Sequence, residues 1–120
     1  MGSLLVHVTH GPEAPTRAAL ACTVAKAAKD GGHDVTLFFA GDAAYLIKDE
    51  VVATMKGLGT GSLSEVLPAL IDAGVPIFVS GMSSQARGVT ERDLEDKGAT
   101  FAMPSKLVEL AFDADRVLVY

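Results

Sequence analysis

Three short apolar runs, at residues 4–8, 35–39 and 76–79, constrain the fold of this chain more than any other feature. Each has the length of a strand, is nearly continuous in apolar residues and is soon followed by glycine, which is typical of a strand buried on both faces. Residues 15–30 are alanine-rich, begin with a proline suited to a first helical turn and end before two glycines. This order of strand, helix and strand predicts a parallel βαβ unit with a right-handed crossover.

The rest of the chain continues the alternation of helices and strands. The further predicted elements are a short helix and mobile loop at 43–55, a helix at 62–74, a polar loop at 82–88, a short helix from 90, a brief strand at 100–102, a helix at 105–112 and a strand at 117–120. Ser62 and Glu65 have the spacing of a capping box, and Ser105 is predicted to cap a later helix. The pattern predicts an α/β fold over residues 1–120 as one domain: a three-layer α/β/α sandwich of flavodoxin-like appearance, with a mostly parallel sheet of about five strands. It leaves the strand order open.

Composition excludes several classes of function. The chain is 49% hydrophobic with a mean hydropathy of +0.34, yet no apolar run is long enough to span a bilayer, so the excess apolar surface is expected to meet another copy of the chain. The N-terminus lacks the pattern of a secretory signal, which predicts a cytoplasmic protein without membrane contact. A net charge of -5 without a basic cluster argues against nucleic acid. Scattered histidines and a single cysteine predict no metal site, and no cofactor motif is present.

Polar residues follow each of the first three predicted strands. Because parallel strands gather ligands at their carboxyl ends, these residues are expected to form one pocket. The candidate ligand-binding residues are His10, Gly11, Asp42, Ser80, Gly81, Ser83, Ser84 and Arg87. Arg87 suits a small anion because its guanidinium fork matches phosphate, sulfate or carboxylate, although Glu91 or Asp93 could equally pair with it.

Several of these residues have a structural interpretation beside the functional one. His10 and Ser80 are the catalytic candidates, as a general base and a nucleophile with Glu13 or Asp42 as the orienting acid, but the Gly-x-Ser-x-Gly elbow is missing. The Ser80 hydroxyl could instead bond a neighbouring backbone group at a strand end. His7 interrupts an apolar strand and is expected to be a hydrogen-bonded core histidine. The glycine-rich run at 57–62 lacks the ending of a phosphate loop, which favours a flexible connector.

Several segments together resemble the DsrE/DsrF-like family. They are residues 9–13, the Gly-Gly-His-Asp-Val turn at 31–35, the Phe-Phe-Ala-Gly-Asp run at 38–42 and the Arg-Gly-Val at 87–89, and the resemblance covers nearly the whole chain. It implies a small α/β fold, assembly into a homotrimer or homohexamer, and a link to sulfur relay through a persulfide on a cysteine that ends the third strand. The position that matches this cysteine is Ser80. Serine cannot hold a persulfide.

Cys22, the single cysteine, lies within the alanine-rich helix and is predicted to pack as a small apolar residue. The sequence therefore favours a homo-oligomeric binding or accessory protein without a relay thiol, whose partners are a small anion or sulfur-pathway proteins. One alternative is a small enzyme that uses His10, Ser80 and Arg87 on an anionic substrate. Another is a sulfurtransferase that uses Cys22.

Overall fold

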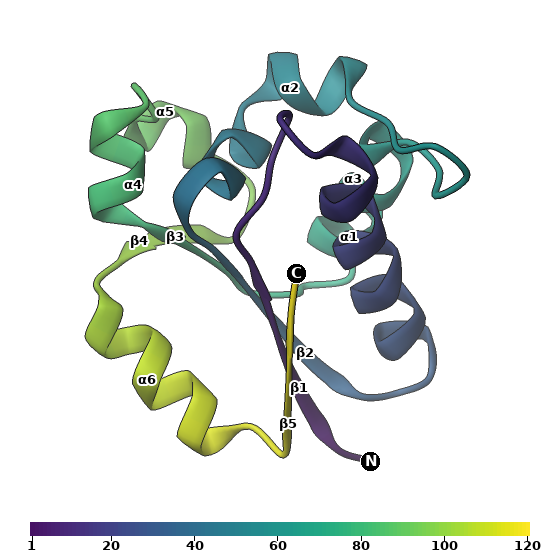
Figure 1. The fold of residues 1–120 in the computed structure, drawn as a ribbon. Coiled ribbons are helices and arrows are strands. Elements are labelled where there is room, and N and C mark those ends of the chain that lie inside the picture. Colours follow the sequence, from purple (N-terminus) through teal and green to yellow (C-terminus); the bar gives the residue numbers. More distant parts are fainter.

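The computed structural model describes residues 1–120 and contains one five-stranded sheet in which every neighbouring pair is parallel (Figure 1). The strands are β1 (Ser3–Val8), β2 (Asp34–Phe39), β3 (Ile77–Ser80), β4 (Ala99–Ala102) and β5 (Arg116–Val119). Their order across the sheet is β4-β3-β2-β1-β5. The predicted α/β fold is confirmed, and the first three strands begin and end within one residue of their predicted bounds.

The helices cover the two faces of the sheet unequally. They are α1 (Pro15–Asp30), the 3-10 helix η1 (Gly41–Ile47), α2 (Asp49–Thr54), α3 (Leu63–Asp72), α4 (Gly81–Ala86), α5 (Glu91–Leu94) and α6 (Pro104–Asp113). Figure 1 shows α1 and α3 on one side of the sheet and α6 on the other. The strands β2, β3 and β4 are added one after another on the same side of β1, whereas β5 lies on the other side of β1. Since crossover connections are right-handed, the connection from β4 to β5 runs in the reverse direction and places α6 on the opposite face of the sheet. The third layer of the sandwich is therefore α6.

The main core lies between the sheet and α1 with α3. Ala18, Ala21, Cys22 and Ala25 on α1 are completely buried, and these small side chains allow the helix to lie close to β1 and β2. The opposite face is less well covered, because α6 has no buried residue. None of the helices combines the length and apolar character needed to cross a membrane.

Local helix signals account for the differences from the sequence prediction. The Ser62 hydroxyl pairs with that of Ser64 at 3.0 Å and does not cap α3, so the predicted capping box is wrong there. The segment at 82–88, predicted as a loop, begins with α4 because Ser80 caps that helix. The last helix begins at Pro104, not at Ser105, since proline has the backbone angle of a first helical residue.

The segment at 43–55 and the glycine-rich run after it also have a defined form. Where one short helix was predicted there are two, η1 and α2, separated at Lys48, whose backbone is extended. The glycine-rich run bonds to α1 at two points: the Leu58 amide donates to the Thr16 hydroxyl at 3.0 Å, and the Thr23 hydroxyl donates to the Thr60 carbonyl at 3.1 Å. The run therefore packs beside the first half of α1.

His7 lies on the α6 side of the sheet, with its ring edge-on to Phe38 at 5.8 Å between centroids. The sequence predicted a hydrogen-bonded core histidine, but the buried Nε2 atom has no partner, so this part of the prediction is wrong. Burial lowers the pKa of His7, because the charged imidazolium is poorly solvated there. Folding thus selects the neutral ring.

This selection predicts a loss of stability on mild acidification. As the pH falls below the ordinary pKa of 6.5, the unfolded state binds a proton that the folded state does not, so the free energy of unfolding decreases down to the lowered pKa of folded His7. Because one histidine takes up at most one proton, the free energy of unfolding changes by less than about 1.4 kcal/mol per pH unit. Chemical denaturation between pH 7 and pH 5 should show a weaker dependence in His7→Leu, and equal slopes in the two proteins would contradict the assignment.

Candidate functional site

The predicted site residues lie at the carboxyl edge of the sheet, in two separate groups. Asp42, Ser80, Ser83 and Arg87 form a hydrogen-bonded cluster, which we call the β3-end cluster. His10 belongs to a cavity at the ends of β1 and β5. The single pocket expected from the sequence is therefore resolved into a bonded cluster and an open cavity.

The serines of the β3-end cluster are occupied by backbone amides. The Ser80 hydroxyl accepts a hydrogen bond from the Ser83 amide at 3.2 Å and so caps α4. The Ser83 hydroxyl accepts a bond from the Gly41 amide at 2.8 Å, which joins α4 to the segment after β2. These hydroxyls hold the chain together at this edge, which is the structural interpretation of Ser80.

Arg87 of the β3-end cluster already holds a carboxylate. Its Nε atom donates to the Asp42 carboxylate at 3.0 Å and its Nη1 atom to the Ser83 carbonyl at 3.1 Å. The guanidinium also lies 5.9 Å from the centroid of the Tyr45 ring. Glu91 and Asp93, the partners considered from the sequence, do not pair with it; a small anion would have to displace Asp42.

The other candidates occupy packed positions. A Cβ atom on Gly11 would lie 2.1 Å from the Asp42 carbonyl oxygen, so the two segments approach closely because this residue is glycine. Gly81 is the first residue of α4. Ser84 is 1% exposed and its hydroxyl has no hydrogen-bond partner, so it does not face solvent.

His10 is held from its Nδ1 side by Glu13. The two side chains meet at 2.7 Å, and the other carboxylate oxygen of Glu13 accepts a bond from the Gly11 amide. Partial burial raises the pKa of Glu13, but the bonds from Gly11 and His10 outweigh it and hold the pKa below its usual value. An ionised Glu13 favours the tautomer with hydrogen on Nδ1, which leaves Nε2 as an acceptor.

Arg17 is the residue of this region that the sequence reasoning missed. Its Nη1 atom lies 3.4 Å from His10 Nε2, and both line a cavity of about 840 Å³ together with Thr9, Leu20 and Tyr120. The signal in the sequence was a basic residue in a predicted first helical turn that contains no acidic one. Because a cation at a helix N-terminus does not stabilise the helix, Arg17 has no helix-stabilising role at this position.

The two catalytic candidates do not form a dyad. No hydrogen bond joins His10 to Ser80, whose hydroxyl is engaged by the Ser83 amide. The two residues follow β1 and β3, and β2 lies between these strands. The two acids considered as the third member have other partners: Glu13 bonds His10 and Asp42 bonds Arg87.

Cys22 lies in the hydrophobic core, out of contact with solvent. Its side chain is completely buried, and this burial raises the pKa of the thiol from 9.0 to about 12. A reactive cysteine needs the opposite, an exposed thiol with a lowered pKa. No three histidine, cysteine, aspartate or glutamate side chains gather in a group that could hold a metal ion.

Comparison with known proteins identifies the family. The fold resembles the crystal structure of the YchN protein from E. coli, with a TM-score of 0.81, 18% sequence identity and all of both chains covered. No curated protein matches the sequence significantly. The model of the DsrE/DsrF-like family matches residues 2–120. The chain, with its five parallel strands and a serine at the end of β3, is therefore a member of the DsrE/DsrF-like family.

Proposed function

We propose that this protein is a cytoplasmic, homo-oligomeric accessory protein of its family, which binds a small anion or a sulfur-pathway partner and carries no persulfide itself. The observation that carries the proposal is Ser80. It ends β3, where the family resemblance places the relay cysteine, and its hydroxyl caps α4. An alcohol is hardly ionised near neutral pH and has no equivalent of persulfide chemistry.

The environment of Cys22 supports the same proposal. Burial raises the pKa of the Cys22 thiol from 9.0 to about 12, so the reactive thiolate is far scarcer at neutral pH than in an exposed cysteine. In addition, complete burial shields the sulfur from any donor. Sulfur transfer through Cys22 would require the core to open.

Sulfur loading tests the proposal directly. We expect the intact mass of the native protein to stay unchanged after incubation with inorganic polysulfide, and iodoacetamide to label Cys22 far more slowly in the native protein than in the denatured chain. Cys22→Ala serves as the control that assigns any adduct. Ser80→Cys should gain sulfur at the end of β3. A sulfur adduct on native Cys22 would refute the proposal, and an inert Ser80→Cys would refute the assignment of the relay position.

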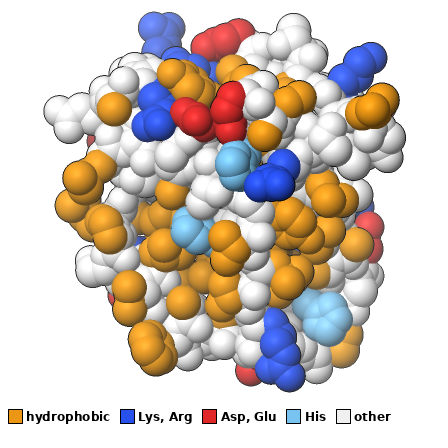
Figure 2. Space-filling view, in the orientation of Figure 1, with side chains coloured by type: hydrophobic (Ala, Val, Ile, Leu, Met, Phe, Trp, Pro, Cys, Tyr) orange, Lys and Arg blue, Asp and Glu red, His pale blue; other side chains and the backbone are white.

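The surface around β5 supports self-association. All four residues of this edge strand are exposed, including Val117, Leu118 and Val119, and β5 has β1 as its single neighbour in the sheet. Phe112 on α6 is 87% exposed as well. On the face shown in Figure 2, hydrophobic side chains gather on both sides of β5. Apart from Arg116 at its start, this exposed strand is uncharged, and its outer edge has amide and carbonyl groups that another strand can satisfy.

We propose that β5 pairs with β5 of a second copy. The run from Val117 to Val119 is free of charge, so two copies of a chain with net charge -5 can meet there without direct repulsion. A contact of one strand with itself is two-fold symmetric, and a two-fold contact requires an even number of subunits. Of the two states that the family resemblance suggests, this contact favours the hexamer over the trimer.

A small enzyme is the second candidate, and the pairing of His10 with Glu13 beside an open cavity is the observation in its favour. An imidazole oriented by a carboxylate can move a proton near neutral pH, and Arg17 could orient an anionic substrate. Ser80 is engaged as a helix cap, so the nucleophile would be water. A rate profile that depends on pH and is lost in His10→Gln would support this candidate over pure binding.

A further inference from the structure

The cavity at the ends of β1 and β5 has a polar end and an apolar side. Thr9, His10 and Arg17 supply the polar end, and Pro15 and Leu20 of α1 belong to the apolar lining. Its volume of about 840 Å³ is within the range of small-molecule pockets, roughly 300–1,000 Å³. It opens beside β1 and β5, the one pair of neighbouring strands that are not consecutive in the sequence, which is where α/β sheets bind ligands.

Arg17 is the free cation of this cavity. No carboxylate lies within 4.0 Å of its guanidinium, whereas Arg87 is paired with Asp42. The first turn of α1 contains no acidic residue and has no side-chain cap, so its amide groups add to the positive potential. Glu13 is the nearby acid, and both of its oxygens are engaged by His10 and Gly11. The positive charge of Arg17 is thus left available to a ligand.

His10 fixes the position of this charge. Its Nδ1 atom is held by Glu13 at 2.7 Å, and its Nε2 atom lies 3.4 Å from Arg17 Nη1, close enough to accept a bond from it. The guanidinium makes no other hydrogen bond with the protein, so its remaining N–H groups can bind a ligand. The series Glu13, His10 and Arg17 therefore aligns a guanidinium beside the cavity without neutralising it.

We propose that this cavity binds a small organic oxyanion, with its phosphate, sulfate, sulfonate or carboxylate group on Arg17 and its apolar body against Pro15 and Leu20. Arg17 is the binding residue and His10 is a positioning residue. A guanidinium presents parallel N–H groups that fit two oxygens of such a group. An inorganic anion would leave the apolar side of the cavity empty, which is why an organic ligand is assigned. This inference rests on the proposed binding function and names its ligand class and site.

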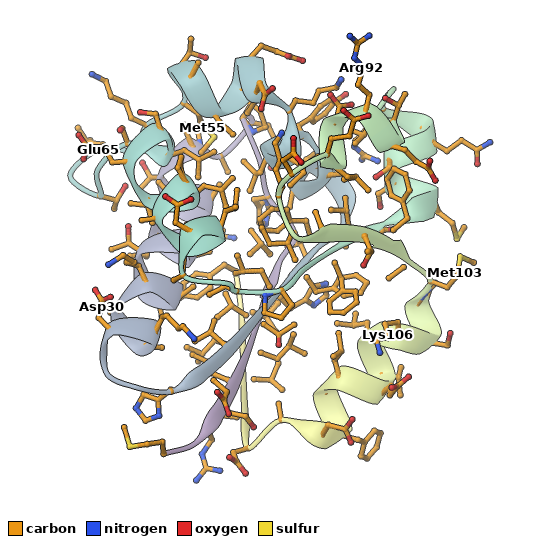
Figure 3. The ribbon with its side chains drawn as sticks, turned by 180° about the vertical axis from the view of Figure 1, so that it is seen from behind. Asp30, Met55, Glu65, Arg92, Met103 and Lys106 are labelled. Carbon is orange, nitrogen blue, oxygen red and sulfur yellow. The ribbon has the colours of Figure 1, made fainter.

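Titration with phenyl phosphate tests the site, with Arg17→Gln as the variant and Arg92→Gln as the matched control. Arg92 is an exposed arginine of α5 without an ion pair, and Figure 3 shows it pointing away from the protein. Isothermal titration calorimetry should give an affinity at least about tenfold weaker for Arg17→Gln, because a charge-assisted, bidentate contact is lost. Arg92→Gln should bind like the unchanged protein. Inorganic phosphate should bind at least about tenfold more weakly than phenyl phosphate, since it lacks the apolar body.

The role of His10 is tested by two substitutions. His10→Leu removes the acceptor that holds Arg17 and should weaken phenyl phosphate binding, whereas His10→Gln keeps a side-chain oxygen that can accept from the guanidinium and should restore part of the affinity. Equal affinities in the Leu and Gln variants would contradict a positioning role. Far-UV circular dichroism checks that each variant is folded.

Two results would overturn the proposed site: absence of phenyl phosphate binding, or an equal affinity in Arg17→Gln and Arg92→Gln. Tighter binding of inorganic phosphate than of phenyl phosphate would overturn the organic ligand class. These failures can be distinguished from failure of the proposed function. A sulfur adduct on Cys22 would refute the proposed function but would not affect Arg17-dependent binding of phenyl phosphate. If only the binding of phenyl phosphate fails, the proposed function still stands, with a sulfur-pathway protein bound on the surface as its partner.

Discussion

Replacing Gly11 with alanine is expected to lower the free energy of unfolding by roughly 1–3 kcal/mol, the usual cost of forcing extra volume into a packed position. The added Cβ would lie 2.1 Å from the Asp42 carbonyl oxygen, a backbone atom that cannot move without displacing the start of η1. The Gly11 amide also holds Glu13, which in turn holds His10. The substitution should therefore weaken ligand binding in the cavity as well as the fold.

Gly81→Ala is the matched control for this prediction. The nearest heavy atom to a Cβ at Gly81 is 3.9 Å away, an ordinary contact, and alanine suits the helical backbone there better than glycine. Urea denaturation should show a lower midpoint for Gly11→Ala and an unchanged or slightly higher midpoint for Gly81→Ala. Similar midpoints for the two variants would mean that the approach of the two backbones at Gly11 is not tight.

Placing lysine at Val119 is expected to convert the oligomer into monomers. Val119 is 63% exposed on the edge strand, and pairing β5 with a second β5 would bury the new charge of each copy in a desolvated contact. Lysine on edge strands is a common means by which proteins prevent such pairing. Size-exclusion chromatography with light scattering should report the monomer mass of about 12.4 kDa for this variant.

Met82→Lys is the corresponding control, since Met82 has the same exposed fraction, 63%, but lies on α4. It should keep the oligomeric state of the unchanged protein. If Met82→Lys dissociates the oligomer and Val119→Lys does not, self-association involves α4 and not β5. A monomer at all concentrations before any substitution would contradict self-association itself.

The fold was predictable because its determinants are local. Buried parallel strands must be apolar on both faces, and the stop signals after the first three of them are glycines, so strand bounds and the βαβ order follow from the sequence. The strand order depends on how distant elements pack, which the pattern does not contain. Short helices were harder to predict. The helix α4 begins at a glycine, which is typical of a loop, and its cap is the hydroxyl of Ser80, which the sequence also allowed other roles.

The site was predictable in its place and not in its contacts. The candidate residues named from the sequence do lie at the carboxyl edge of the sheet, but the sequence indicated Arg87 as the anion-binding arginine because its partner, Asp42, lies 45 residues away. Arg17 was not considered from the sequence; it is exposed on the first turn of α1 and lines the cavity. Which cation is neutralised is a tertiary property, and it decides which one can hold an anion.

Native mass spectrometry of the freshly purified protein tests the central claim most directly, because one spectrum reports the subunit number, any retained ligand and any covalent sulfur. The account predicts an even-numbered oligomer, a hexamer by family resemblance, whose subunits have the unmodified mass after denaturation. A subunit mass increased by one sulfur on Cys22 would contradict it, because the buried thiol with a pKa of about 12 should not carry a persulfide.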